Sequence, residues 1–124
     1  MPKRILIAED QLGTRETLIK CAERKGYEVV AVANGVRLVS LASERDFDVV
    51  ITDLIMPDLN GVASINILKF KGITTPVIAL TGLSPEDTEP FQNNFTKIFH
   101  KPINITELFA YVETLLGKSA GALV

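Results

Sequence analysis

The sequence predicts an α/β fold with a doubly wound parallel sheet and helices on both of its faces. Five short apolar runs alternate with helix-like segments along the 124 residues. Four of the five runs are continuous rather than alternating, which is typical of strands buried on both faces of a parallel sheet. The length fits one domain, and 47% of the residues are hydrophobic, enough for one core.

The predicted strands are the five apolar runs, at residues 5–8, 29–33, 49–51, 77–80 and 98–99. Several of them are rich in valine and isoleucine, whose branched side chains favour strands. Their alternation with helices requires crossover connections, which are right-handed in such sheets. Five strands of this kind predict the flavodoxin-like strand order 2-1-3-4-5.

Four segments have the apolar spacing of helices that pack on a sheet, at residues 12–25, 35–45, 62–70 and 105–116. The apolar stripes of the first three are predicted to include Leu12, Val36 and Phe70. Asn104 is expected to cap the last helix, and Gly117 is expected to end it.

The remaining helix, the fourth of five, is predicted to be short or irregular. Ser84 and Pro85 suit a helix start, because serine caps helices and proline fits the first turn. Pro90 then breaks or kinks any longer helix. We therefore expect a single turn or a loop within residues 84–94.

Composition argues against several functions. The single cysteine, Cys21, rules out an intrachain disulfide and favours a reduced, cytoplasmic setting. The first apolar run has only four residues, too few for a signal peptide or a membrane span. The net charge is −2 and no run of Lys and Arg exceeds two residues, so direct nucleic-acid binding is not expected. The predicted domain covers residues 1–117, and residues 118–124 are expected to form a flexible tail or the start of a linker.

Chemically active side chains follow four of the predicted strands. Glu9 and Asp10 follow the first strand, Asp53 the third, Thr81 the fourth and Lys101 the fifth. The carboxyl ends of parallel strands meet at one edge of the sheet. We therefore expect three carboxylates, one hydroxyl and one ammonium group around a single pocket.

Three carboxylates in one pocket require a cation. Two carboxylates about 4 Å apart repel by roughly 4 kcal/mol at an effective dielectric constant near 20. Oxygen ligands favour Mg²⁺ over zinc. With Mg²⁺ bound, Asp53 is a candidate nucleophile for a phosphoryl group, Lys101 supplies positive charge and Thr81 supplies a hydroxyl donor. Each residue alone has an ordinary interpretation as a helix start, turn, cap or surface charge. Their joint occurrence at the strand ends favours the functional interpretation.

Four stretches carry a resemblance to a known family: residues 5–10, 51–61 and 77–82 and the pair Lys101-Pro102. The most specific is Asp-Leu-x-Met-Pro-x-Leu-Asn-Gly, which begins at Asp53. Over residues 3–116 the chain resembles the receiver domain of two-component response regulators. The resemblance implies that Asp53 accepts a phosphoryl group, that Lys101 pairs with it, and that the Lys101–Pro102 bond is cis.

The resemblance also implies a metal site. Mg²⁺ would be bound by Asp10, Asp53 and the backbone carbonyl of Ile55, with Glu9 acting through a metal-bound water. The phosphoryl donor would be a sensor histidine kinase or a histidine phosphotransfer protein. Phosphorylation would change a face made of the fourth helix, fifth strand and fifth helix. That face would bind a downstream effector protein or output domain, and it allows a phosphorylation-linked homodimer.

Under this interpretation the chain is not an enzyme, beyond promoting its own phosphorylation and dephosphorylation. Two alternatives stay open. One is a phosphorylation-independent interaction module of the same fold. The other is a phosphohydrolase with an aspartyl nucleophile, which Ile55 disfavours because such enzymes usually carry a second acid at that position.

Three features depart from the family pattern. Ile98 stands where the family has an aromatic residue that rotates inward, and Phe99, on the opposite face, is expected in the core. The short fourth helix predicts an unusual output surface. Ile55 and Leu83 would flank the phosphoryl group, and their apolar side chains predict restricted water access and slow loss of phosphate. The only histidine, His100, is assigned no role.

Overall fold

The structure is a computed structural model that describes residues 2–117, so the expected tail at 118–124 lies outside the described residues. The strands are β1 (Arg4–Ala8), β2 (Glu28–Val32), β3 (Val49–Asp53), β4 (Val77–Thr81) and β5 (Lys97–His100). The helices are α1 (Leu12–Arg24), α2 (Gly35–Glu44), α3 (Gly61–Phe70), α4 (Pro85–Thr88) and α5 (Ile105–Leu116), with a 3₁₀-helix, η1 (Glu89–Asn94), before β5.

The five strands form one parallel sheet in the order β2-β1-β3-β4-β5, which confirms the predicted topology. The register keeps the carboxyl ends of the strands level. Ala8 at the end of β1 pairs with Thr52 of β3, and Thr81 at the end of β4 pairs with His100 of β5. The residues that follow the strands therefore lie along one edge of the sheet, where sheets of this class carry their sites.

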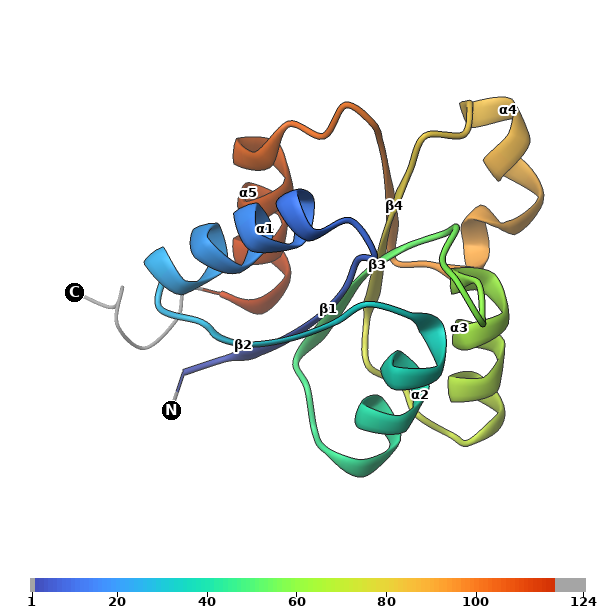
Figure 1. Cartoon of the computed structure of the whole chain (residues 1–124), viewed down its shortest axis with the longest axis horizontal. Helices are drawn as coiled ribbons and strands as arrows, with labels where there is room; N and C mark the ends of the chain where they lie inside the picture. The colour runs from blue at the N-terminus through green and yellow to red at the C-terminus, as the bar shows by residue number, and fades with distance from the viewer. Residues whose placement is uncertain (1, 118–124) are drawn as a thin grey trace.

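Helices cover both faces of the sheet (Figure 1). On one face, α1 and α5 pack over a core that includes Ile7, Leu18 and Phe109. On the other face, α2 and α3 pack over a core that includes Leu6 and Ile65. Successive residues of a strand thus enter different cores, which explains why the apolar runs in the sequence are continuous.

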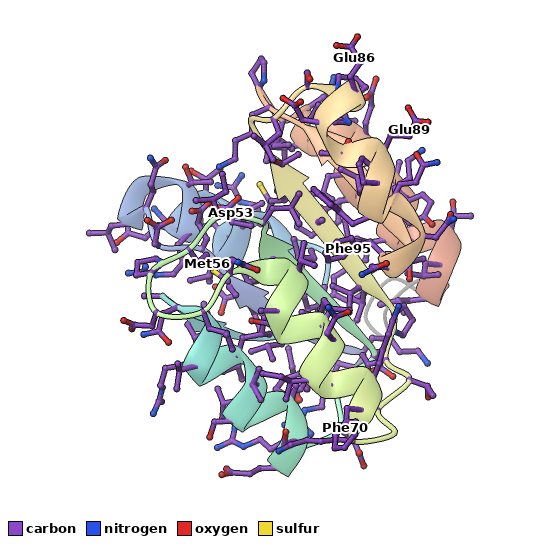
Figure 2. The ribbon with its side chains drawn as sticks, turned by 90° about the vertical axis from the view of Figure 1, so that its right-hand side faces the viewer. Asp53, Met56, Phe70, Glu86, Glu89 and Phe95 are labelled. Carbon is purple, nitrogen blue, oxygen red and sulfur yellow. The ribbon has the colours of Figure 1, made fainter. Side chains whose placement is uncertain are left out.

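Three predicted members of the helical stripes are wrong. Leu12, Val36 and Phe70 are 59%, 53% and 93% exposed. All three lie in the first or last turn of their helix. Figure 2 shows Phe70 at the end of α3 that lies far from Asp53. Helical periodicity identifies the buried face of a helix, but it does not show where the helix extends beyond the sheet.

The fourth helix is short, as predicted. Ser84 caps it, because its Oγ accepts a hydrogen bond from the amide of Asp87 at 3.3 Å. Helix α4 then lasts only four residues. Pro90 falls within η1, which departs from helical geometry at Phe91 with φ −126°. The segment between β4 and β5 is therefore one helical turn followed by an irregular 3₁₀ stretch.

The last helix begins and ends where the sequence predicts. The Oδ1 atom of Asn104 accepts a hydrogen bond from the amide of Glu107 at 3.0 Å. Gly117 follows the helix with φ 75°, in the left-handed region that glycine adopts without strain. Within residues 2–117, no helix is both long and apolar enough to cross a membrane.

Candidate functional site

The backbone at the strand ends places the five predicted site residues together. Asp53 is the last residue of β3 and Thr81 the last residue of β4. Glu9 directly follows β1, and its amide donates to the carbonyl of Val32 at 3.0 Å. Lys101 directly follows β5, and its amide donates to the carbonyl of Thr81 at 2.7 Å. The sheet hydrogen bonds thus continue past the strands and fix where these side chains start.

Three carboxylates meet at this edge of the sheet. Glu9, Asp10 and Asp53 each offer one oxygen, and these oxygens lie within 4.8 Å of one another. The side chains differ in environment, because Glu9 is fully buried, Asp53 is 4% exposed and Asp10 is exposed. The site therefore has a buried floor and an edge that opens to solvent.

Lys101 is the basic partner of these acids. Its Nζ atom lies 3.0 Å from Oδ1 of Asp53 and 3.7 Å from Oε1 of Glu9. Burial alone would lower the pKa of Lys101, but the interactions with Asp53, and then with Glu9 and Asp10, raise it. The side chain therefore stays charged, and it supplies one positive charge against three carboxyl groups.

The charge of the site is not balanced. Burial, followed by the neighbouring Asp53 carboxyl, raises the pKa of Glu9 to about 7, although the amide of Gln11 works against this shift. Within residues 2–117, the buried atoms Oε1 of Glu9 and Oδ1 of Asp53 have no hydrogen-bond partner. The 3.0 Å contact of Asp53 with Lys101 is thus an ion pair without hydrogen-bond alignment.

The donor set fits a hard divalent cation. Lys101 supplies one positive charge to the two buried carboxylate oxygens that lack hydrogen bonds, which leaves the charge of three carboxyl groups only partly compensated. All the side-chain ligand atoms of the cluster are carboxylate oxygens, a donor set that favours Mg²⁺ over zinc. Asp10, at the exposed side of the cluster, leaves a path by which a cation can enter with some of its water.

A small cavity lies beside Asp53. It measures about 40 Å³ and is lined by Asp53, Ile55, Leu80, Thr81, Gly82 and Lys101. Ile55 thus lies at the site, although its side chain is 67% exposed. The Thr81 hydroxyl accepts a hydrogen bond from the amide of Leu83 at 3.0 Å, and its own proton stays available to an oxygen in the cavity.

Sequence reasoning missed three contacts that shape the site. Arg15 donates from Nη1 to the carbonyl of Glu9 at 2.9 Å, which holds the turn between β1 and α1. The start of α3 contacts the residue after β3, since the amide of Gly61 donates to the carbonyl of Leu54 at 2.7 Å. His100 Nδ1 lies 2.8 Å from the carbonyl of Leu83. All three involve backbone carbonyls, which leave no signal in the sequence.

The predicted departures in β5 are also present. Ile98 packs toward the α2–α3 core, whereas Phe99 packs toward the α1–α5 core, so the two side chains lie on opposite faces. Phe99 is only half-buried and meets the ring of Tyr111 edge-on at 5.9 Å between centroids. The Lys101–Pro102 bond is cis, as predicted.

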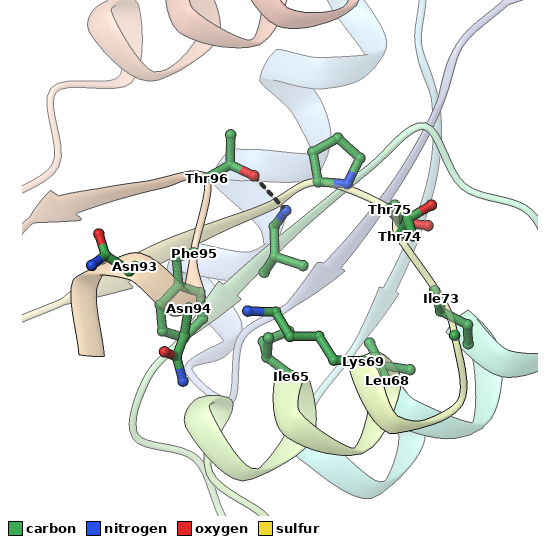
Figure 3. A pocket seen from close by; sticks show the side chains of 13 residues that line it. Ile65, Leu68, Lys69, Ile73, Thr74, Thr75, Asn93, Asn94, Phe95 and Thr96 are labelled. Atoms are coloured by element: carbon green, nitrogen blue, oxygen red, sulfur yellow. Dashed lines mark hydrogen bonds between the residues drawn. The ribbon is translucent and has the colours of Figure 1, made fainter. Parts of the chain in front are cut away.

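A second cavity, of about 330 Å³, lies away from the site (Figure 3). It is bounded by Leu68 and Lys69 of α3 and by Asn93 and Asn94 of η1. Val77, which also lines it, starts β4, whereas Thr81 ends β4 at the site. The two cavities are therefore at opposite ends of the strand.

Comparisons with known proteins agree with this geometry. Residues 5–113 match the response regulator receiver domain family. The cell cycle transcriptional regulator CtrA of Caulobacter vibrioides is 28% identical over 120 residues, which cover 95% of this chain and 52% of CtrA. The chain thus spans about half the length of CtrA. The response regulator receiver protein CpdR of Brucella abortus is 29% identical over 119 residues, which cover 92% of this chain and 97% of CpdR.

A solved structure of a response regulator also matches this chain. The response regulator TrrA of Thermotoga maritima, in complex with Mg²⁺-BeF, has a TM-score of 0.83 and 28% identity, and the match covers 92% of this chain and 99% of that one. The family match and the structural match each extend over most of the chain. The chain therefore belongs to the response regulator receiver domain family.

Proposed function

We propose that this receiver domain accepts a phosphoryl group on Asp53 in a Mg²⁺-dependent reaction, from a sensor histidine kinase or a histidine phosphotransfer protein. The observation that carries the proposal is the meeting of three carboxylates and one lysine at the strand ends, with two buried carboxylate oxygens that lack hydrogen bonds. A cation would balance the charge of the carboxylates, and a phosphoryl group would give Lys101 and Thr81 oxygen atoms to bind.

The carboxylates would hold the metal. Asp10 and Asp53 would bind Mg²⁺ together with the backbone carbonyl of Ile55, and Glu9 would act through a metal-bound water. When bound, Mg²⁺ supplies positive charge that neutralises the acids and the phosphoryl oxygens. Its binding would also offset the burial and the neighbouring Asp53 carboxyl that together raise the pKa of Glu9.

The chain's own residues would then carry out the transfer. A carboxylate oxygen of Asp53 attacks phosphorus, the bond from phosphorus to the donor nitrogen breaks, and the nitrogen keeps the electron pair. Lys101 already lies 3.0 Å from Asp53, so its ammonium group would pair with a phosphoryl oxygen. The Thr81 hydroxyl, at the rim of the same cavity, would donate its proton to another phosphoryl oxygen.

Phosphorylation would be read at the face formed by α4, β5 and α5, by a downstream effector protein, an output domain or a second phosphorylated copy, in the cytoplasm. This face carries exposed acids near the short helix, at Glu86, Asp87 and Glu89. Figure 2 shows Glu86 and Glu89 projecting from this segment away from Asp53. A partner with basic residues would complement them.

One experiment separates the candidate functions. The chain is incubated with acetyl phosphate and Mg²⁺, and its intact mass is measured for the wild type, Asp53→Asn and Asp58→Asn. Asp58 is the matched control, because it is an exposed acid in the loop that follows Asp53 and its φ of 69° suits asparagine. We expect one phosphoryl group on the wild type and on Asp58→Asn, and none on Asp53→Asn.

The other outcomes point to the alternatives. A wild type that never gains a phosphoryl group would support an interaction module that works without phosphorylation. Turnover of a small phosphoester that depends on Asp53 would support a phosphohydrolase.

A further inference from the structure

Both backbone groups of Leu83 are bonded to strand ends. Its amide donates to Oγ1 of Thr81 at 3.0 Å, and its carbonyl lies 2.8 Å from Nδ1 of His100. A carbonyl oxygen can only accept, so Nδ1 carries the proton in this hydrogen bond. The loop after β4 is thus held by β4 through Thr81 and by β5 through His100.

The side chain of Leu83 lines a cavity that adjoins the site through Ile55. This cavity measures about 320 Å³ and is also lined by Leu54, Ile55, Asn60, Val62 and Phe91. Ile55 also lines the small cavity beside Asp53. The position of the Leu83 backbone therefore decides whether an apolar surface continues from Ile55 along this side of Asp53.

Besides these hydrogen bonds, the loop is held by the partly buried side chain of Leu83, which packs against the α2–α3 core. Leu83 precedes a helix of only four residues, which ends in the irregular η1. Gly82, between Thr81 and Leu83, is exposed, and a Cβ added to it would meet nothing within 4 Å. A short helix and an uncrowded glycine constrain the loop weakly on either side of Leu83, so its two backbone hydrogen bonds add to the core packing in fixing where its backbone lies.

The two hydrogen bonds would respond differently to phosphorylation. The Thr81 hydroxyl would turn toward a phosphoryl oxygen, and the amide of Leu83 would then lose its acceptor. The bond from His100 does not involve Thr81. It would persist when the hydroxyl turns.

We propose that His100 is a positioning residue of the phosphoryl site, whose ring Nδ1–H holds Leu83 and its apolar side chain beside phosphorylated Asp53. The inference rests on the proposed function. Its consequence concerns hydrolysis, in which a water oxygen bonds to phosphorus, the bond from phosphorus to the Asp53 oxygen breaks, and the water proton passes to solvent. An apolar side chain held next to this bond limits the approach of water. His100 therefore prolongs the phosphorylated state.

The test uses two substitutions of His100. His100→Phe keeps the ring volume and removes the donor, whereas His100→Asn places an amide donor near the position of Nδ1. Thr96→Val is the control for lost stability, because it removes the hydroxyl that accepts a hydrogen bond of 3.2 Å from the amide of Val77 at the other end of β4. Unfolding by denaturant is measured for all variants.

Two readouts follow on the full chain. The first is hydrogen exchange of the amides of residues 82–84 in the unphosphorylated protein. The second is the half-life of the Asp53 phosphate after the donor is removed. We expect His100→Phe to raise the exchange rate of these amides and the rate of phosphate loss by about two- to tenfold each, the range that loss of one net hydrogen bond gives. We expect His100→Asn to remain near the wild type in both, and Thr96→Val to be as destabilised as His100→Phe with an unchanged half-life.

Each outcome decides the question. Equal half-lives for the wild type and His100→Phe would overturn the positioning role, even with phosphorylation intact. Failure of His100→Asn to restore the wild-type half-life, or an equally shortened half-life in Thr96→Val, would also overturn it. A wild type that takes no phosphoryl group would refute the proposed function and the effect on hydrolysis. In that case the exchange of residues 82–84 would still show whether His100 holds the loop.

Discussion

Replacement of Gly61 by alanine would disturb the backbone of Asp53 directly. A Cβ at this position would lie 2.6 Å from the carbonyl oxygen of Asp53 and 3.0 Å from the Cα of Leu54. Ordinary contact begins near 3.4 Å, so α3 and the end of β3 must separate by about 0.8 Å. Overpacking of this kind costs about 1–3 kcal/mol.

The gain from alanine offsets part of this cost. Replacing glycine reduces the entropy of the unfolded chain, which is worth about 0.4–1 kcal/mol. We therefore expect Gly61→Ala to lower the free energy of unfolding by roughly 1–2 kcal/mol, or the melting temperature by about 3–10 °C. Because the displaced atom belongs to Asp53, we also expect phosphorylation to slow at least tenfold, since misplacement by about 1 Å can cost a hundredfold.

The matched control is Gly13→Ala. Gly13 lies in α1, and an added Cβ would meet nothing within 4 Å. This variant should be more stable than the wild type by about 0.5–1 kcal/mol, because alanine favours helices. Denaturant unfolding and the initial rate of labelling by acetyl phosphate measure both effects. A Gly61→Ala protein that is as stable and as rapidly phosphorylated as the wild type would refute the close approach of α3 to Asp53.

Three further predictions concern other parts of the chain. In metal-free protein, Glu9 has a pKa of about 7 when folded against 4.5 for an ordinary glutamate, so the folded state binds its proton more tightly. The free energy of unfolding should therefore fall, by up to about 3 kcal/mol, as pH rises from about 4.5 to above 7, and Glu9→Gln should remove most of this fall in denaturant titrations with a chelator. Ile55→Asn or Leu83→Glu should shorten the half-life of the Asp53 phosphate, because either polar side chain would admit water; a wild-type half-life of seconds that neither variant changes would count against the apolar barrier. Asn104→Ala should lower stability by about 1 kcal/mol through loss of the α5 cap, and an unchanged unfolding midpoint would mean that the cap contributes nothing.

The sheet and its order could be predicted because burial on both faces leaves a direct mark. Leu6 and Ile7 are adjacent in the sequence and enter different cores, so both must be apolar. The ends of the helices could not be predicted in the same way. Leu12 and Phe70 have the helical spacing of core residues, but they are the first and last residues of their helices and are exposed. Spacing alone does not show which turn of a helix has a neighbour to pack against.

The members of the site could be predicted because the parallel order assigns strand ends to one edge. Glu9, Asp53 and Lys101 meet there as expected. The different burial of Glu9 and Asp10 could not be predicted, because the two acids are adjacent in the sequence. Which of them is buried depends on the path of the turn after β1. The hydrogen bond between His100 and Leu83 could not be predicted either, because it depends on the path of a loop.

The phosphoryl content of the wild-type chain, measured against Mg²⁺ concentration and mapped by peptide mass, addresses the main proposal most directly. We predict one phosphoryl group per chain, on the peptide that contains Asp53, which rises with Mg²⁺ and is absent in a chelator. A phosphoryl group on another residue, or labelling that is the same with and without Mg²⁺, would contradict the account.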